Sequence, residues 1–160
     1  MDCDDGNATM TGERNLLKLV DAEPEEGYRL QEQIGFVLRK AHQRHVAIFA
    51  AKIADLTPPQ FAALAKLADV GETSQNQLGS LIAMDAATVK GVIDRLKARG
   101  LVELTRHEID RRRLLVSLTR QGRETIERLI PLAEEITAET LQPLSVREAA
   151  TLLRLLARIA

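Results

Sequence analysis

Two short amphipathic segments, residues 74–83 and 85–100, follow one another so closely that they constrain the fold more than any other feature. In both segments apolar residues recur at the spacing of one helical face. These apolar positions are Leu78, Leu81 and Ile82 in the first segment and Val89, Val92, Ile93 and Leu96 in the second. We therefore predict two consecutive helices joined by a tight turn.

Residues suited to helix ends stand at the boundaries of both segments. Ser74 and Asp85 have side-chain oxygens that can cap the first turn of a helix. Gly100 suits the left-handed position that follows a helix. The turn between the two helices is expected near Met84.

Two helices joined in this way form a helix-turn-helix, in which the second helix usually enters the major groove of DNA. With its apolar stripe buried, the second helix turns Ala87, Lys90, Gly91 and Asp94 outward, and Thr88 lies on the flank. Lys90 can reach a phosphate or a guanine, and Ala87 or Thr88 a thymine methyl group. Short helical hairpins are common. The pair of helices by itself therefore fits an ordinary amphipathic hairpin as well as a DNA-binding helix-turn-helix.

A basic β-hairpin is predicted directly after the second helix. Residues 101–107 and 113–118 alternate in polarity, so that the apolar side chains of both strands share one face. These side chains are Val102, Leu104, Leu114, Val116 and Leu118.

The tip of this hairpin carries Asp110, Arg111, Arg112 and Arg113. A charged run is ordinarily a solvated surface. After a recognition helix, however, projecting arginines are typical of a wing that enters the minor groove, where the negative potential is enhanced. Asp110 can hold Arg112 or cap the turn, and so orient the tip.

The charge distribution agrees with a DNA-reading module. Residues 74–123 contain ten Lys and Arg against five Asp and Glu, although the whole chain has a formal net charge of -1. Positive charge is thus concentrated on the segment that would meet the phosphates.

The run T-V-K-G-V-I-D-R-L-K-A-R-G-L-V, followed by D-R-R-R-L-L-V-S-L-T-R-Q-G, resembles the winged helix of the MarR family of bacterial regulators. The most specific part is D-x-R with a downstream V-x-L-T-x-x-G, formed here by residues Asp110, Arg112, Val116, Leu118, Thr119 and Gly122. In element order the resemblance covers roughly residues 28–159. It implies a homodimer that binds a pseudo-palindromic operator, usually as a repressor, and is released by a small molecule, often an aromatic acid.

The resemblance also assigns roles to single residues. Thr88 matches a position that commonly contacts DNA, and Arg112 matches the arginine of the wing tip. Many members have a small polar residue and then arginine after T-V, whereas this chain has Lys90 and Gly91. A common base contact is therefore lost or transferred to Lys90.

Four further helices are indicated outside this module. They are expected over residues 28–54, from the Thr57-Pro58 start to Gly71, from Thr119 onward, and from Ser145 onward. The leucines of the last helix are spread too broadly for one buried stripe, so we expect it to pack against a second copy of the chain. Two copies would set the spacing of two reading helices on DNA.

The predicted fold class is therefore mainly α with a small β-hairpin wing, a winged helix-turn-helix flanked by N- and C-terminal dimerisation helices. Residues 57–123 form the DNA-binding domain, and residues 28–56 and 124–160 the helical dimerisation region. Residues 1–27 are acidic and lack periodicity, so we expect a mobile tail that contains at most a short helix.

Control by a ligand is the more open part of the interpretation. His42 and His45 lie on the long helix near Arg39, Phe36 and Phe49, and could form a pocket for an aromatic carboxylate or phenol. Alternatively, the histidines are satisfied within a helix interface. A third interpretation takes H-x-x-H as half of a zinc site in a metal-responsive regulator, but no second His or Cys cluster exists.

Other classes of function find little support. The glycine-rich nucleotide motifs, the H-E-x-x-H zinc motif and the G-x-S-x-G elbow are all missing from the chain, so we expect no enzyme, no cofactor and no metal. No segment resembles a signal peptide or a membrane span, which favours a cytoplasmic protein. The single cysteine, Cys3, cannot form an internal disulfide. A winged helix that binds an acidic protein partner remains an alternative.

Overall fold

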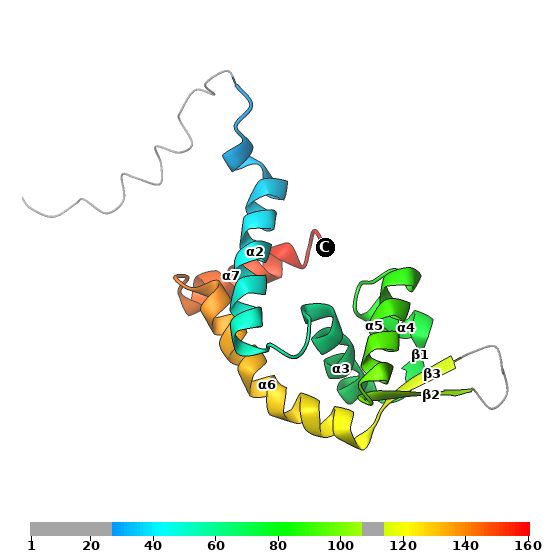
Figure 1. The fold of residues 1–160 in the computed structure, drawn as a ribbon. Helices are drawn as coiled ribbons and strands as arrows, with labels where there is room; N and C mark the ends of the chain where they lie inside the picture. Colours follow the sequence, from blue (N-terminus) through cyan, green and yellow to red (C-terminus); the bar gives the residue numbers. More distant parts are fainter. Residues whose placement is uncertain (1–26, 107–113) are drawn as a thin grey trace, which may run out of the picture. The chain divides into compact units, whose positions relative to one another are not determined.

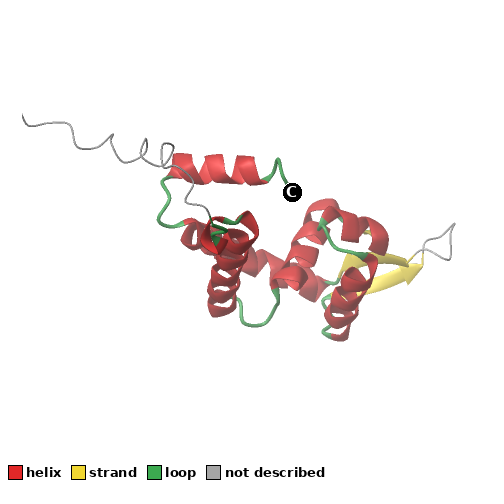
Figure 2. Cartoon of the chain, turned by 90° about the horizontal axis from the view of Figure 1, so that it is seen from above, coloured by secondary structure: helices red, strands yellow, loops and turns green. Residues whose placement is uncertain are grey.

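The computed structural model describes residues 27–106 and 114–160, which divide into one unit that ends at Val37 and another that comprises Leu38–Ala160. The chain is mainly helical with one small sheet (Figure 1), as the sequence predicts. The elements are η1 (Leu30–Glu32), α2 (Ile34–Lys52), α3 (Pro58–Val70), β1 (Thr73–Ser74), α4 (Gln75–Leu81), α5 (Ala86–Ala98), β2 (Val102–Arg106), β3 (Leu114–Leu118), α6 (Arg120–Leu141) and α7 (Val146–Leu156). Figure 2 shows the strands together in one sheet.

The helices start where local capping residues stand. Before α3 the Thr57 hydroxyl accepts the Gln60 N–H at 3.4 Å, and the Gln60 side chain accepts the Thr57 N–H at 3.0 Å. Pro58 then occupies the first turn, where its missing N–H costs nothing. The other predicted caps are also confirmed, namely Ser74 for α4, Asp85 for α5, Thr119 for α6 and Ser145 for α7.

The first long helix is shorter than predicted. The sequence indicates a helix over residues 28–54, but α2 begins at Ile34 after the separate turn η1, and it ends at Lys52. Between η1 and α2, Gln33 is extended, with φ -81° and ψ 128°. Tyr28 and Leu30 are exposed, so no packing within the described chain extends the helix toward them.

The sheet has the order β1-β3-β2 and is antiparallel throughout. In the hairpin Val102 lies opposite Leu118 and Leu104 opposite Val116, which confirms the shared apolar face. The short strand β1 was not predicted. It pairs Thr73 with Val116 and Ser74 with Leu115, and so places the β3 strand at the centre of the sheet.

The core lies where α3 packs against α5, α6 and the sheet. Its largest fully buried side chains are Leu64, Leu67, Leu78, Ile93, Leu96, Ile126, Ile136, Val89 and Val116. The stripe predicted for α5 is thus confirmed as buried. This packing fixes which face of α5 remains outside.

Candidate functional site

The outward face of α5 is the first candidate surface. Ala87, Thr88 and Lys90 are exposed, whereas Val89 and Val92 on the opposite side are almost fully buried. The predicted division of the helix into a buried stripe and a free face is therefore confirmed. The side chains proposed to meet DNA are the accessible ones.

Asp85 shapes the start of this face. Its carboxylate accepts the Thr88 N–H at 2.8 Å and the Thr88 hydroxyl at 2.8 Å. These hydrogen bonds to Thr88 hold the pKa of the Asp85 carboxyl below its ordinary value. The hydroxyl hydrogen of Thr88 is therefore used within the helix, and its methyl group and oxygen lone pairs are what DNA could meet.

Lys90 is held by a partner on its own helix. Its ammonium lies 2.7 Å from the Asp94 carboxylate, one turn further along α5. Asp94 was predicted to lie on the outer face of α5, but its pairing with Lys90 was not predicted, although their spacing of four residues is a signal for such a pair. The ion pair orients Lys90 along the helix and partly neutralises its charge.

The turn between α4 and α5 is tight. A Cβ on Gly79 would lie 3.0 Å from the Met84 carbonyl oxygen and 3.2 Å from Val89 Cγ1. Ala83 has a φ of 53°, in the left-handed region that L residues rarely adopt. Gly79 thus lets α4 approach α5 closely, and the two helices hold a defined angle.

The junction between the wing and α6 explains the L-T-x-x-G motif. The Thr119 hydroxyl donates to the Gly100 carbonyl at 2.6 Å and accepts the Gly122 N–H at 3.0 Å. The Thr119 N–H donates to the Leu101 carbonyl at 3.1 Å. Thr119 therefore joins the end of the α5 helix to the start of α6. The predicted wing-tip residues Asp110, Arg111, Arg112 and Arg113 lie outside the described residues.

The ligand candidates on α2 have different surroundings. A hydrogen bond of 3.1 Å joins His45 Nδ1 to the Thr140 hydroxyl on α6. Phe49 is buried and packs against Phe61 with ring centroids 5.9 Å apart, and the His45 and Phe49 rings are 6.4 Å apart. His42 is exposed. The structure thus brings His45 and Phe49 together, next to α6.

Of the other two ligand candidates on α2, Arg39 is exposed and Phe36 is half-buried. Phe36 belongs to the unit that ends at Val37.

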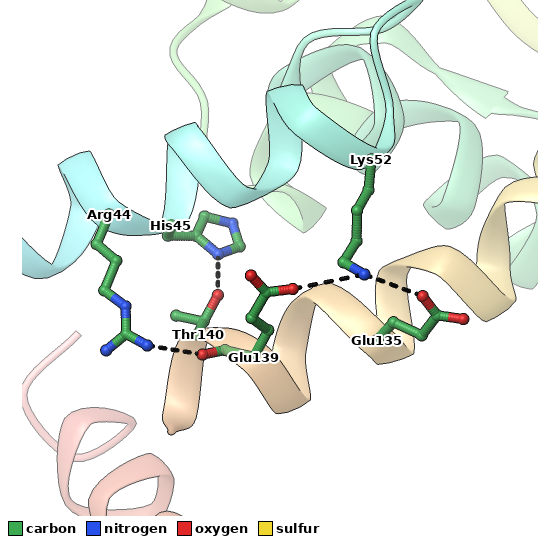
Figure 3. A network of polar contacts seen from close by, with 6 residues as sticks. All are labelled: Arg44, His45, Lys52, Glu135, Glu139 and Thr140. Carbon is green, nitrogen blue, oxygen red and sulfur yellow. Dashed lines mark hydrogen bonds and ion pairs between the residues drawn. The ribbon is translucent and has the colours of Figure 1, made fainter. Parts of the chain in front are cut away.

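Polar contacts fasten α2 to α6 on either side of His45 (Figure 3). The Arg44 guanidinium donates to the carbonyls of Gln142 at 2.7 Å and Glu139 at 2.9 Å, at the end of α6. Lys52 lies 3.1 Å from Glu135 and 3.4 Å from Glu139. The hydrogen bond that Lys52 donates to the Glu135 carboxylate raises the pKa of Lys52.

A cavity of about 430 Å³ lies elsewhere in the same unit. It is lined by Lys52, Ile53, Ala54, Asp55, Leu56, Arg99, Leu101, Gln121, Thr125, Arg128, Leu129 and Leu132. None of the five ligand candidates from sequence analysis is among these residues. The cavity residues come from three separate segments, residues 52–56, 99–101 and 121–132, so no sequence pattern identified them.

Comparison with known proteins places this geometry in a family. Residues 54–113 match the model of the MarR family. The chain is also similar to the HTH-type transcriptional repressor NicR of Pseudomonas putida, with 41% identity over 134 residues, which covers 82% of this chain and 85% of NicR. The chain belongs to the MarR family.

Solved structures of MarR type share the fold over nearly their full lengths. A probable transcriptional regulator from Pseudomonas aeruginosa has 52% identity and a TM-score of 0.79, and the match covers 82% of this chain and 100% of that one. Bordetella bronchiseptica BpsR, described with regulation of its DNA binding by 6-hydroxynicotinic acid, has 43% identity and a TM-score of 0.80. That match covers 83% of this chain and 96% of BpsR. These MarR-type relatives are transcriptional regulators, and this chain shares their fold and belongs to their family.

Within residues 27–106 and 114–160 no group of three or more His, Cys, Asp or Glu side chains is placed to hold a metal ion. No helix of the described chain is both long and apolar enough to cross a membrane.

Proposed function

We propose that this protein is a homodimeric, ligand-responsive repressor that binds a pseudo-palindromic DNA operator and leaves it when a small aromatic acid or phenol binds. The observation that carries the proposal is the free face of α5, where Ala87, Thr88 and Lys90 are exposed opposite a fully buried stripe. Asp110, Arg111, Arg112 and Arg113 stand in the sequence between β2 and β3, and we propose that they form the wing tip. Such a protein would act in the cytoplasm, where its operator lies.

The apolar surface of α7 supports the homodimer. No residue of α7 is buried in the single chain. Leu153 is 52% exposed and Ile159 just beyond the helix is 70% exposed. Monomeric proteins rarely leave a continuous apolar face in water. A second copy would cover it and would place two α5 helices for successive major grooves, about 34 Å apart.

The effector proposal rests on the surroundings of His45. His45 contacts α6 through Thr140 and lies beside Phe49, so an anion bound there would touch both helices. Arg39, His42 and Phe36 remain further candidates for that pocket. BpsR, with 43% identity, is regulated by 6-hydroxynicotinic acid, a heteroaromatic carboxylic acid, and this supports the same chemical class for this chain.

The decisive experiment begins with recovery of genomic DNA fragments bound by the full-length protein, followed by sequencing. Affinity for the recovered operator is then measured at several salt concentrations for the native protein and for Arg112→Ala. We expect Arg112→Ala to weaken operator binding sharply with little change in thermal stability. Arg147→Ala, exposed on α7 and outside the basic segment 74–123, removes the same charge and serves as the control.

The proposal fails if the protein ignores every duplex offered. A DNA reader loses affinity steeply as salt rises, because neutralised phosphates release counterions. A protein that shows neither operator preference nor salt dependence would instead favour a winged helix that binds a protein partner.

A further inference from the structure

The long helix α6 ends without the local residues that commonly close a helix. Its last turn, residues 138–141, has the sequence A-E-T-L, with one glutamate and no basic side chain. The C-cap, Gln142, is extended, with φ -63° and ψ 139°, and the next residue is Pro143 and not a left-handed glycine. The last carbonyls of α6 therefore need partners from elsewhere in the chain.

Arg44 on α2 is such a partner. Its guanidinium donates to the Glu139 carbonyl at 2.9 Å (Figure 3) and to the Gln142 carbonyl at 2.7 Å. Hydrogen bonds from a charged donor are stronger than those between neutral groups, and a cation at this end of α6 is also favoured by the helix dipole. Arg44 thus caps the C-terminus of α6, although 95 positions separate it from Glu139 in the sequence.

The helix α7 follows this end of α6 after a short turn. The Leu144 N–H donates to the Leu141 carbonyl at 2.9 Å, and the capping box of Ser145 then starts α7. No residue of α7 is buried in the single chain, so packing within the described residues does not fix its direction. The direction of α7 is therefore set at the turn, where Arg44 holds the Gln142 carbonyl.

Lys52 offers a comparison on the same pair of helices. Its ammonium lies 3.1 Å from the Glu135 carboxylate and 3.4 Å from the Glu139 carboxylate. Both contacts hold α2 against α6 through side chains. Arg44 differs because it binds backbone carbonyls at the point where the chain leaves α6.

We propose that Arg44 is a positioning residue, which fixes the direction in which α7 leaves α6 and thereby the spacing of operator half-sites that the dimer accepts. This inference rests on the proposed function, because it takes α7 as the interface of the homodimer. The direction of α7 in each copy then sets the distance and the angle between the two α5 helices. One base pair moves a half-site by about 3.4 Å along the DNA and by roughly 35° around it. A loosened turn should therefore appear as tolerance of a wrong spacing.

The operator test uses the full-length protein and two duplexes, which carry the recovered operator with its natural half-site spacing or with two base pairs inserted between the half-sites. The native protein should bind the lengthened operator more weakly by about tenfold or more, because the two DNA-reading heads no longer engage together. Arg44→Gln should reduce this ratio to about threefold or less. Lys52→Gln removes a charge from the same helix and should keep the native ratio.

The direction of α7 can also be measured without DNA. Spin labels are attached to Glu134→Cys on α6 and Arg154→Cys on α7, both exposed positions, after Cys3→Ser removes the native thiol. Pulsed electron paramagnetic resonance gives the distribution of distances between the labels, and an excess of unlabelled chains keeps the measured distances within one chain. Arg44→Gln should broaden this distribution, whereas Lys52→Gln should leave it unchanged.

Arg44→Lys separates charge from geometry. Lysine keeps the positive charge but lacks the planar fork that reaches two carbonyls, so Arg44→Lys should fold and still broaden the distribution of label distances. It also replaces Arg44→Gln in both tests if the glutamine variant does not fold. A native distribution in Arg44→Lys would overturn the role of the two carbonyl contacts.

Two further results would overturn the positioning role. They are a native distribution of label distances in Arg44→Gln, and equal broadening in Arg44→Gln and Lys52→Gln. A broadened distribution with an unchanged spacing ratio would reject the link between Arg44 and the operator. If the native protein binds no duplex, the proposed function fails, and the label distances still decide whether Arg44 positions α7.

Discussion

Gly122 packs so closely on Leu101 that a Cβ built on Gly122 would lie 1.9 Å from the Leu101 carbonyl oxygen. That oxygen also accepts the Thr119 N–H. The first turn of the α6 helix therefore rests directly on the backbone that enters β2. The closing glycine of the L-T-x-x-G motif has a steric cause, because any side chain would separate the wing from α6.

Gly122→Ala should destabilise the fold by about 3 kcal/mol or more, because the clash is with backbone and a flexible side chain cannot relieve it. Gly91→Ala is the matched control, since nothing lies within 4 Å of a Cβ on that helical glycine. It should instead stabilise α5 by about 0.5–1 kcal/mol. Urea unfolding of both variants measures the difference, and equal effects would contradict this explanation of the motif.

Asp85 should make stability depend on pH in acid. The hydrogen bonds from Thr88 lower the pKa of Asp85 in the folded protein. The contribution of Asp85 to the free energy of unfolding is therefore complete above the ordinary pKa of 3.8, and it disappears as the pH falls through the lower folded pKa. Asp85→Asn keeps a capping side chain but does not titrate. The gap in unfolding free energy between the native protein and Asp85→Asn should therefore narrow as the pH falls through this window. A gap that stays constant would contradict the charged cap.

Asp94→Asn should release Lys90 and strengthen binding to any duplex, while the preference for operator over scrambled DNA falls. The gain should be about 1 kcal/mol or less, because the pair is exposed to solvent. Asp69→Asn removes the carboxylate of a comparable exposed pair with Lys66 on α3 and should change neither quantity. If Asp94→Asn and Asp69→Asn change DNA binding equally, the cause is the change in net charge and not the position of Lys90.

His45→Ala should reduce the release of operator DNA by 6-hydroxynicotinic acid while DNA binding itself persists. Thr140→Val is the control, because it removes the partner of the 3.1 Å hydrogen bond and keeps the histidine. A purely structural histidine predicts equal loss of stability in both variants and an unchanged ligand response. Gel shifts and thermal melts on the same samples separate these outcomes.

Truncation after Gln142 removes α7 and should convert the proposed homodimer to monomer or aggregate, as measured by sedimentation. Leu153→Glu should weaken the dimer more selectively, since Leu153 is exposed in the single chain and a buried unpaired carboxylate is costly at an interface. Thr151→Glu adds the same charge among the arginines of the opposite face of α7 and should leave the dimer intact. A stable dimer in the truncated protein would place the interface elsewhere.

The local features of the fold were predictable from sequence because they depend on neighbouring residues. Thr57 caps α3 and Asp85 caps α5 through hydrogen bonds within the first helical turn, and Pro58 occupies the first position of α3. The shared face of Val102, Leu104, Val116 and Leu118 follows from their period-two spacing in the sequence. The free face of α5 follows from the same periodicity.

Features that depend on distant partners were missed. Strand β1 has only two residues and exists because Thr73 meets Val116, over forty positions away in the sequence. The cavity joins Lys52, Arg99 and Arg128 from three separate helices or their caps, and no spacing reveals that. The packing of Phe49 on Phe61 in the core also joins distant positions, and the role of Phe49 as a ligand contact stays a prediction.

Ser74 is both the last residue of β1 and the N-cap of α4, and β1 is paired to the β3 strand of the wing. Ser74 thus belongs both to the helix-turn-helix and to the sheet of the wing. We therefore expect a tilt of one to be accompanied by a tilt of the other. Major-groove and minor-groove contacts should therefore be made and lost in one concerted step, and dissociation from DNA should follow a single exponential.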